Sequence, residues 1–436
     1  MHNFFKDLGL DDQTHYWFIS GDQTSTIEWE AALIEEVQEE ALKKAVLDAM
    51  QIHTHFRSHP VIVGGRVKVS IDDEVKQVPV FAEDGRPRQF GTSQTNGYLF
   101  YAAFQGDKLY LRLFHGLSDG RGSLSFLTTL LLCYVKETKQ IQIDLPEPDS
   151  SDDIPVTEQI LKEYAGSKAI GRFDADDHME DVFRLSVDRF KEKDRKWRVF
   201  EIDVPLASLL AVSSRNESSV VPVLETIIGN AIRRKYDVGD KLIIGYTPVD
   251  MRQIFGLKTG GNGSTAVSVP YPPVMDKFDL GKRFMLMRSI LDLQIQPENI
   301  YAGQKNLTEI YNKVCSQPYP IEIIVPAVKK NRPRAGAMTP YTYGISYPGK
   351  VRFQEPVEPI VNSVVSSVSA ASFPLMIVAS EYNGTIRIMV TQLFDSDETA
   401  KVIFNEIANL IPGTAFIDRG IKNYDRLDLE LLEHMD

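Results

Sequence analysis

Apolar residues recur at helical spacing between residues 36 and 56, which predicts an amphipathic helix with one face packed on a core. The predicted buried stripe of this helix contains Leu42, Ala45, Val46, Ala49 and Met50. Shorter apolar runs bounded by turn residues predict strands. In the first half these runs lie at residues 61–63, 98–104 and 109–114, and a second helix is expected from about residue 123 to 135. The turn at residues 105–108 joins the last two strands into a hairpin.

The second half of the chain repeats this alternation of strands and helices. Its strand-like runs lie at residues 197–204, 241–249, 374–380 and 385–393, and its helices at residues 220–236 and 397–410. Pro222 falls in the first turn of a helix, where its missing N–H costs nothing. Asn383 and Gly384 predict a tight hairpin turn. Without the glycine fingerprint of a dinucleotide-binding unit, the alternation indicates a mixed α/β fold.

The length of 436 residues indicates two hydrophobic cores, because single cores stop growing beyond roughly 250–300 residues. The chain shows no repeat of the period that solenoids have. We therefore predict an N-terminal lobe of residues 1–195 and a C-terminal lobe of residues 196–436.

The formal net charge of −12 argues against a nucleic-acid partner, which would require a basic face. The most apolar run, residues 126–135, has about half the length of a membrane-spanning helix. Residues 1–13 mix charges without an apolar core, so we expect no secretory signal. The two cysteines fit no metal or redox spacing. These features predict a cytoplasmic protein without a membrane span or a bound metal.

The sharpest chemical feature is the segment FHGLSDG at residues 114–120. His115 stands at the end of a predicted strand, and Asp119 and Gly120 follow in the loop before a helix. A neutral imidazole in such a position can accept a proton from a hydroxyl or an amine at physiological pH. The aspartate could instead hold the loop by pairing with a distant arginine. The alternative is a surface turn that contains these residue types by chance.

Three further groups of residues contain side chains that could form sites. His53, His55 and His59 lack an acid or thiol partner at metal-ligand spacing, so we interpret them as a solvated helix end. Cys133 lies among apolar helix residues and is interpreted as core. Residues 260–263 are glycine-rich but lack the lysine of a phosphate loop, which indicates a turn of close backbone approach.

The most basic stretch of the acidic chain lies at residues 329–334 and is either an exposed loop or a phosphate site. Its cations would suit the phosphate groups of a donor substrate. The residues concerned are Lys329, Lys330, Arg332 and Arg334.

The segment FHGLSDG resembles the His-x-x-x-Asp-Gly motif of the superfamily that contains chloramphenicol acetyltransferase, alcohol acetyltransferases, plant acyl-CoA-dependent acyltransferases and nonribosomal peptide condensation domains. Two further segments match in the same order. PVDMR at residues 248–252, followed by glycines up to Asn262, resembles a region of the alcohol acetyltransferase-like branch. SYPG at residues 346–349 resembles a Ser-Asn-x-Gly strand segment, with Tyr347 in place of the asparagine. The similarity spans most of the chain and is closest to the alcohol acetyltransferase-like branch.

Two departures from the superfamily's patterns narrow the resemblance. Phe114 stands where condensation domains usually carry a second histidine, which favours an acyl-CoA enzyme over peptide condensation. The Asp-Phe-Gly-Trp-Gly segment of the plant members is missing from the sequence.

The resemblance implies two similar lobes, each a mixed sheet with flanking helices, and a tunnel between them. It further implies that His115 is the general base, that Asp119 supports the site by pairing with Arg252, and that Gly120 completes the motif. Ser346 or Asn262 would donate to the oxyanion or line the tunnel.

The expected reaction moves an acyl group from acyl-CoA, as co-substrate, to an alcohol or an amine. No permanently bound cofactor is needed, because a thiolate is a good leaving group. An acyl carrier protein as donor is the alternative within the same fold, and a non-catalytic binding or scaffold relative is the alternative of another class.

Overall fold

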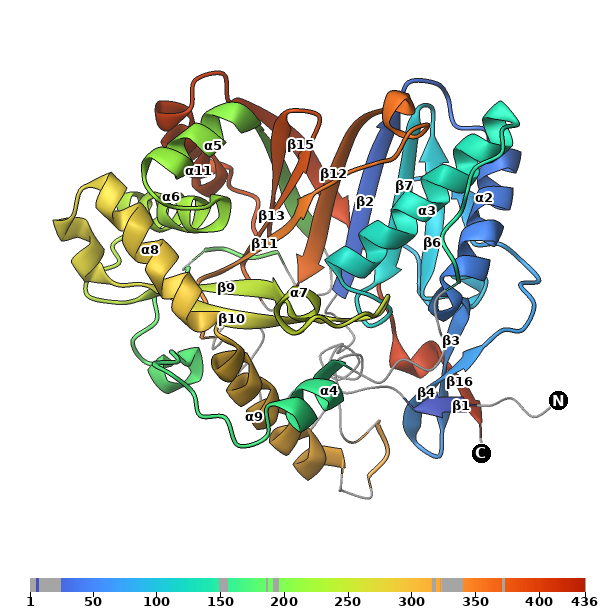
Figure 1. Cartoon of the computed structure of the whole chain (residues 1–436), viewed down its shortest axis with the longest axis horizontal. Helices are drawn as coiled ribbons and strands as arrows, with labels where there is room; N and C mark the ends of the chain where they lie inside the picture. The colour runs from blue at the N-terminus through green and yellow to red at the C-terminus, as the bar shows by residue number, and fades with distance from the viewer. Residues whose placement is uncertain are drawn as a thin grey trace.

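The computed structural model describes residues 5–7, 25–148, 156–185, 187–190, 196–315, 319–321, 323, 340–370 and 373–435. Figure 1 shows two lobes side by side, each built from a sheet with helices packed against it. The predicted mixed α/β fold with two such lobes is therefore confirmed.

The sheet of the first lobe has five strands. Their order is β12 (Val361–Ala370), β2 (Ser25–Leu33), β7 (Lys108–Phe114), β6 (Phe100–Gln105) and β5 (Val80–Ala82). Two helices cover one face of this sheet, α2 (Glu39–Ile52) and α3 (Gly120–Lys139). All five residues of the predicted stripe on α2 are buried, as expected.

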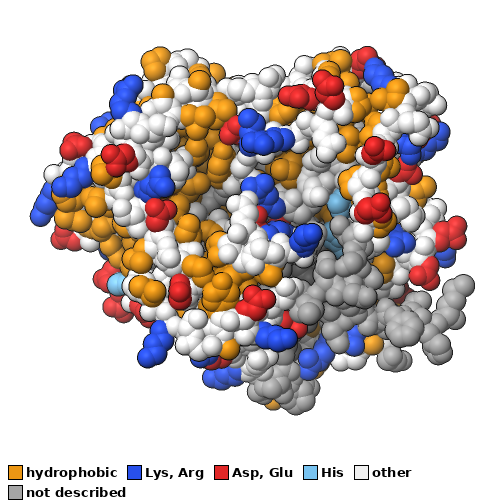
Figure 2. Space-filling model, in the orientation of Figure 1, with side chains coloured by type: hydrophobic (Ala, Val, Ile, Leu, Met, Phe, Trp, Pro, Cys, Tyr) orange, Lys and Arg blue, Asp and Glu red, His pale blue; other side chains and the backbone are white. Residues whose placement is uncertain are grey.

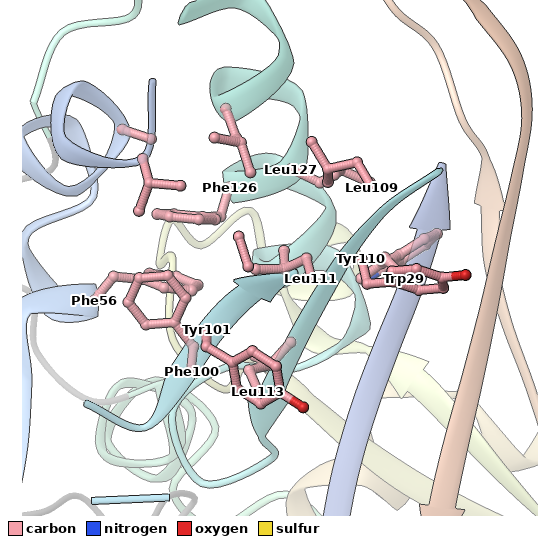
Figure 3. Packing of buried hydrophobic residues seen from close by; sticks show 14 of the residues in the cluster. Trp29, Phe56, Phe100, Tyr101, Leu109, Tyr110, Leu111, Leu113, Phe126 and Leu127 are labelled. Atoms are coloured by element: carbon pink, nitrogen blue, oxygen red, sulfur yellow. The ribbon is translucent and has the colours of Figure 1, made fainter. Parts of the chain in front are cut away.

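Aromatic and aliphatic side chains fill the space between this sheet and its helices (Figure 3). Phe126 of α3 stacks on Phe56, with ring centroids 3.8 Å apart. The indole N–H of Trp29 donates to Ser123 Oγ at 2.9 Å, so β2 is tied to the first turn of α3. Burial of apolar surface stabilises a fold by roughly 25 cal/mol per Å². The packing of this core therefore holds the end of β7 and the start of α3 in place.

The sheet of the second lobe has seven strands. Their order is β10 (Ser264–Tyr271), β9 (Ile243–Asp250), β11 (Tyr343–Lys350), β13 (Leu375–Tyr382), β14 (Thr385–Gln392), β8 (Lys196–Pro205) and β15 (Ala415–Asn423). The helices packed with it are α5 (Leu206–Arg215), α6 (Val220–Lys235), α8 (Leu280–Gln294) and α11 (Glu398–Leu410). The other α-helices of the described residues are α4 (Val156–Glu163), α7 (Met251–Phe255) and α9 (Pro297–Cys315).

Segments of the second half also enter the sheets of the first. β12 pairs antiparallel with β2 along its whole length. A small four-stranded sheet has the order β1 (Phe5–Asp7), β4 (Arg66–Ile71), β3 (Ser58–Val63) and β16 (Glu433–Met435). The boundary between residues 195 and 196 stays a prediction, and it falls where the description resumes at the start of β8. The two lobes are thus joined by shared strands as well as by the chain at this point.

Most predicted elements are present, with shifted ends. α3 begins at Gly120 instead of residue 123, because Asp119 caps it. The hairpin at Asn383 and Gly384 is confirmed, and both residues have positive φ as a tight turn of this kind requires. The helix predicted at residues 397–410 is confirmed as α11, and the edge strand β15 follows it.

The interpretation of His53, His55 and His59 as a solvated helix end is wrong. His53 is buried, and its ring nitrogen lies 2.9 Å from Thr129 Oγ1 of α3. His59 lies in β3, with its two ring nitrogens 2.8 Å from the Gly97 carbonyl and 2.7 Å from Asp72. The rings of His53 and His59 both find hydrogen-bond partners in other segments of the chain. The sequence around the histidines does not reveal these partners. Cys133 is buried in the core as predicted, and burial raises the pKa of its thiol to about 12.

Two further observations concern the described ranges only. No helix there has both the length and the apolar composition that a bilayer span requires. Within the same ranges, no group of three or more His, Cys, Asp or Glu side chains is arranged to hold a metal ion.

Candidate active site

His115 is the first residue beyond β7, and backbone hydrogen bonds fix its position. Its N–H donates to the carbonyl of Ser25 in the neighbouring strand at 2.8 Å. Leu117 N–H donates to the Phe114 carbonyl at 2.9 Å and closes a tight turn around the histidine. The Phe114 ring fills the space beside Gly116, where a Cβ would lie 2.3 Å from the ring. The backbone therefore presents the imidazole from a rigid strand end.

The His115 side chain is half-buried. Burial lowers its pKa, because a charged ring loses hydration there. Its own backbone carbonyl, the charge of Asp119 and a hydrogen bond with Asn262 oppose this shift without reversing it. Nδ1 is shielded from solvent. The ring is therefore neutral at physiological pH and keeps a proton-accepting nitrogen.

Asp119 caps the N-terminus of α3 and accepts hydrogen bonds from four residues. Its carboxylate accepts from the N–H groups of Arg121 at 3.0 Å and Gly122 at 2.9 Å. It also accepts from Gly263 N–H at 2.8 Å and from Arg252 Nη1 at 2.8 Å. Burial by itself would raise the pKa of Asp119, but the Arg252 charge and these hydrogen bonds hold it below its usual value. The carboxylate is therefore ionised and fully occupied with holding the loop.

The ion pair expected between Asp119 and Arg252 is present, and every N–H of the guanidinium has an acceptor. Nη1 also reaches Asp250 at 3.2 Å, and Nη2 reaches the second oxygen of Asp119 at 3.2 Å. Nε and Nη2 donate to the carbonyls of Thr259 and Gly261 at 2.8 and 2.5 Å. Arg252 thus ties the motif of the first lobe to the loop between β9 and β10 of the second.

Glycines allow this loop to lie directly on the start of α3. Ser118 Oγ donates to the Gly260 carbonyl at 2.7 Å. A Cβ on Gly122 would lie 2.1 Å from that same carbonyl oxygen, and one on Gly263 would lie 2.5 Å from Cζ of Arg252. The predicted turn of close backbone approach is therefore confirmed. By contrast, a Cβ on Gly120 would meet Pro348 at an ordinary 3.5 Å.

Asn262 interacts with His115, whereas for Ser346 the structure gives a position in the neighbouring sheet. Asn262 is buried, and its side chain interacts with the histidine ring in the sense that raises the pKa of the ring. Ser346 lies in β11 beside a register shift that extends to Gly349, and the neighbouring Tyr347 hydroxyl donates to Glu381 at 3.1 Å. The roles of Asn262 and Ser346 as oxyanion donors stay predictions.

The basic residues Lys329, Lys330, Arg332 and Arg334 lie outside the described residues. A different basic cavity, which sequence reasoning missed, lies between α3 and the end of β11. It has a volume of about 490 Å³ and is lined by Arg121, Leu124, Ser125, Thr128, Lys350 and Arg352. Figure 2 shows basic side chains gathered in the middle of the face where the lobes meet. His115 does not line this cavity, and the tunnel itself stays a prediction.

No family model matches the sequence, and no curated protein matches it either. Solved structures do resemble the fold. Polyketide synthase associated protein 5 from Mycobacterium tuberculosis aligns with a TM-score of 0.62 at 12% identity, over 93% of this chain and 98% of its own. The condensation domain of the Monacolin K polyketide synthase aligns with a TM-score of 0.60 at 11% identity, over 93% and 96%.

A third structure is the epimerization domain from the third module of tyrocidine synthetase B. It aligns with a TM-score of 0.59 at 13% identity, over 93% of this chain and 97% of its own. The chain therefore has the fold of condensation domains. At these identities the similarity shows the fold alone, and activity has to be argued from the site.

Proposed function

We propose that this protein is a transferase of the condensation type, which moves an acyl group from a carrier-protein thioester to an alcohol or an amine. The observation that carries the proposal is the half-buried, neutral His115 on a rigid strand end, in a loop that the Asp119–Arg252 ion pair locks. The fold shared with condensation domains supports the same chemistry.

The proposed step needs one proton acceptor and no metal. His115 removes the proton of the acceptor's hydroxyl or amine as its oxygen or nitrogen attacks the thioester carbonyl. The C–S bond then breaks, and the thiolate leaves and takes up the proton from the imidazolium. Since Nδ1 of His115 is shielded, Nε2 is the nitrogen that we assign to this transfer.

In this proposal Asp119 does not touch the substrate. Its carboxylate accepts from Arg121, Gly122, Gly263 and Arg252, so its role is to hold the loop and the start of α3. We assign to Asn262 the role of orienting the histidine ring, with which its side chain interacts. Donation to the oxyanion is assigned to Ser346 or Asn262, as the sequence suggested.

A free acyl-CoA is the second candidate donor. The observation that favours it is Phe114, which occupies the position of the second histidine of condensation domains and packs its ring under Gly116. Structural similarity to several condensation domains favours the carrier-borne donor, which is why we place it first.

The test compares donors. The wild-type protein is given the same acyl groups on a phosphopantetheinylated carrier protein or on coenzyme A, with pooled alcohols and amines as acceptors, and thiol release is followed. Faster release from the carrier is expected. Release from coenzyme A alone would establish the second candidate, and no acceptor-dependent release from either donor would refute the proposed transfer.

A further inference from the structure

The basic cavity beside the motif is chemically unusual for this chain. Its six lining residues include three cations and no carboxylate, although the chain carries a net charge of −12. Arg121, Leu124, Ser125 and Thr128 lie on one face of α3, at the spacing i, i+3, i+4 and i+7. Lys350 and Arg352 face them from the end of β11 and the segment that follows.

The positive charges in this cavity are only weakly compensated. Arg121 Nε lies 3.8 Å from Asp250, and Lys350 Nζ lies 3.5 Å from Glu381. Both side chains remain about half exposed, at 41% and 53%. Arg352 is exposed and forms no ion pair with any residue that the structure describes. An anion that enters the cavity would therefore gain one cation without an ion pair among these residues, Arg352, and two cations that the protein's own carboxylates hold only at long range.

The position of the cavity relates it to the proposed chemistry. Arg121 directly follows Gly120 of the motif, and its guanidinium packs close to Gly349. From Arg121 the lining extends about 10 Å along α3 to Thr128, at the helical rise per residue. The cavity thus leads away from the loop that carries His115, and its volume of about 490 Å³ is in the range of small-molecule sites.

A phosphopantetheine arm has a thiol at one end and a phosphate at the other, joined by a long uncharged chain. A site that brings its thioester to His115 must hold the phosphate some distance away, and a cluster of Arg and Lys residues suits a phosphate. We infer that the cavity formed by Arg121, Ser125, Lys350 and Arg352 binds the phosphate of the donor's pantetheine arm. This inference rests on the proposed function and adds the subsite that selects the donor.

The test measures binding, so it does not depend on turnover. Pantetheine, 4′-phosphopantetheine and coenzyme A are titrated calorimetrically into the wild type and into the double variant Lys350→Ala/Arg352→Ala. We expect the wild type to bind 4′-phosphopantetheine at least tenfold more tightly than pantetheine, and the double variant to lose most of that preference while binding pantetheine unchanged. Equal binding of the two probes by the wild type, or an unchanged preference in the variant, would overturn the inference.

A matched control removes two cations elsewhere. Lys282→Ala/Arg288→Ala on α8 makes the same change in net charge on a helix of the other lobe, and should keep the full preference (Figure 1). An equal loss in this control would mean that overall charge, and not the cavity, causes the preference. Melting curves are recorded for both variants to check that they are folded.

Coenzyme A distinguishes the two sources of the arm. Binding equal to that of 4′-phosphopantetheine supports a carrier-borne arm, and tighter binding supports free coenzyme A; both keep the phosphate in the cavity. If the wild type prefers 4′-phosphopantetheine over pantetheine as expected but the His115→Ala variant turns over normally, only the proposed function is wrong. If the preference survives the double variant while His115→Ala is inactive, only the subsite is wrong.

Discussion

Two neighbouring ionisable side chains receive different tasks from their surroundings. Burial keeps His115 neutral, whereas Arg252 and three backbone N–H groups keep Asp119 charged. A neutral imidazole can accept a proton, and a charged carboxylate with four donors can only hold structure. The different roles of His115 and Asp119 therefore follow from the groups that surround each side chain.

The pH dependence of the reaction reports the state of His115. Because burial lowers the pKa of the ring below its usual 6.5, the base stays deprotonated on the acid side of that value. We expect the acidic limb of the kcat/KM profile to fall below pH 6.5, measured between pH 4.5 and 9 with a thioester donor. An acidic limb centred above pH 7 would contradict the assignment of this buried ring as the base.

Replacing Asp119 by alanine should act mainly on stability. The change leaves the Arg252 guanidinium partly buried without its main partner, which costs about 3–5 kcal/mol in comparable pairs. Chemical denaturation measures the free energy of unfolding. The control is Asp250→Ala, which removes the more exposed carboxylate of the same arginine and should cost about 1 kcal/mol. If Asp119→Ala unfolded like the wild type but was inactive, the structural role would be wrong.

At the scale of single residues the sequence revealed part of the site. The strand, loop and helix around residues 114–120 were visible in the local pattern, and the resemblance supplied the pairing of Asp119 with Arg252. The N–H of Gly263 and the carbonyls of Thr259 and Gly261 were not foreseen as partners. Backbone groups carry no side-chain signature, and only the run of glycines hinted at the close approach.

At the scale of elements, the site is a contact between the start of α3 and the loop between β9 and β10. Gly122 of the helix faces the carbonyl of Gly260 at a distance that admits no side chain. The motif's own Gly120 lies where a methyl group would make an ordinary contact. The structural demand for glycine is thus stronger two residues beyond the motif than within it.

This contact makes a paired prediction. Gly122→Ala should push the loop away and weaken the Arg252 contacts. We expect the free energy of unfolding to fall by about 2–3 kcal/mol, and the melting temperature and the turnover to fall with it. Gly120→Ala should be tolerated within about 1 kcal/mol. Thermal denaturation compares the melting temperatures of the two variants with that of the wild type. A Gly120→Ala variant less stable than Gly122→Ala would contradict the packing described.

The local pattern revealed the hairpins at residues 105–108 and 383–384, whose paired strands are close in sequence. β2 was not predicted, although its apolar residues alternate with polar ones. Glu28 and Glu30 of this strand are buried, because Lys422 and Arg419 reach them from β15. Partners almost 400 residues away cannot be inferred from the strand itself.

At the scale of the whole molecule, strand exchange and buried charges hold the lobes together. β12 of the second half completes the sheet of the first, and the ion pairs of β2 with β15 bridge the sheets (Figure 1). Although burial alone would raise the pKa of Glu28, Lys422 and Arg112 lower it to about 2. The relative position of the lobes, and with it the contact between Arg252 and Asp119, depends on this network.

Removing Lys422 should therefore destabilise the molecule. Lys422→Ala leaves Glu28 buried with Arg112 alone, and we expect a loss of about 3 kcal/mol in unfolding free energy. Lys401→Ala breaks an exposed pair with Asp397 on α11 and should cost less than about 1 kcal/mol. Urea denaturation of both variants compares them, and equal stabilities would show that the bridge between the sheets contributes nothing.

The central claim is that one imidazole at the end of β7 takes the proton from the acceptor. It is tested most directly by the single-turnover rate of acyl transfer in His115→Ala beside the wild type, with melting curves to confirm that both are folded. The account predicts a loss of about a hundred- to ten-thousand-fold in rate with an unchanged melting temperature. A folded His115→Ala variant that transfers the acyl group within twofold of the wild-type rate would contradict it.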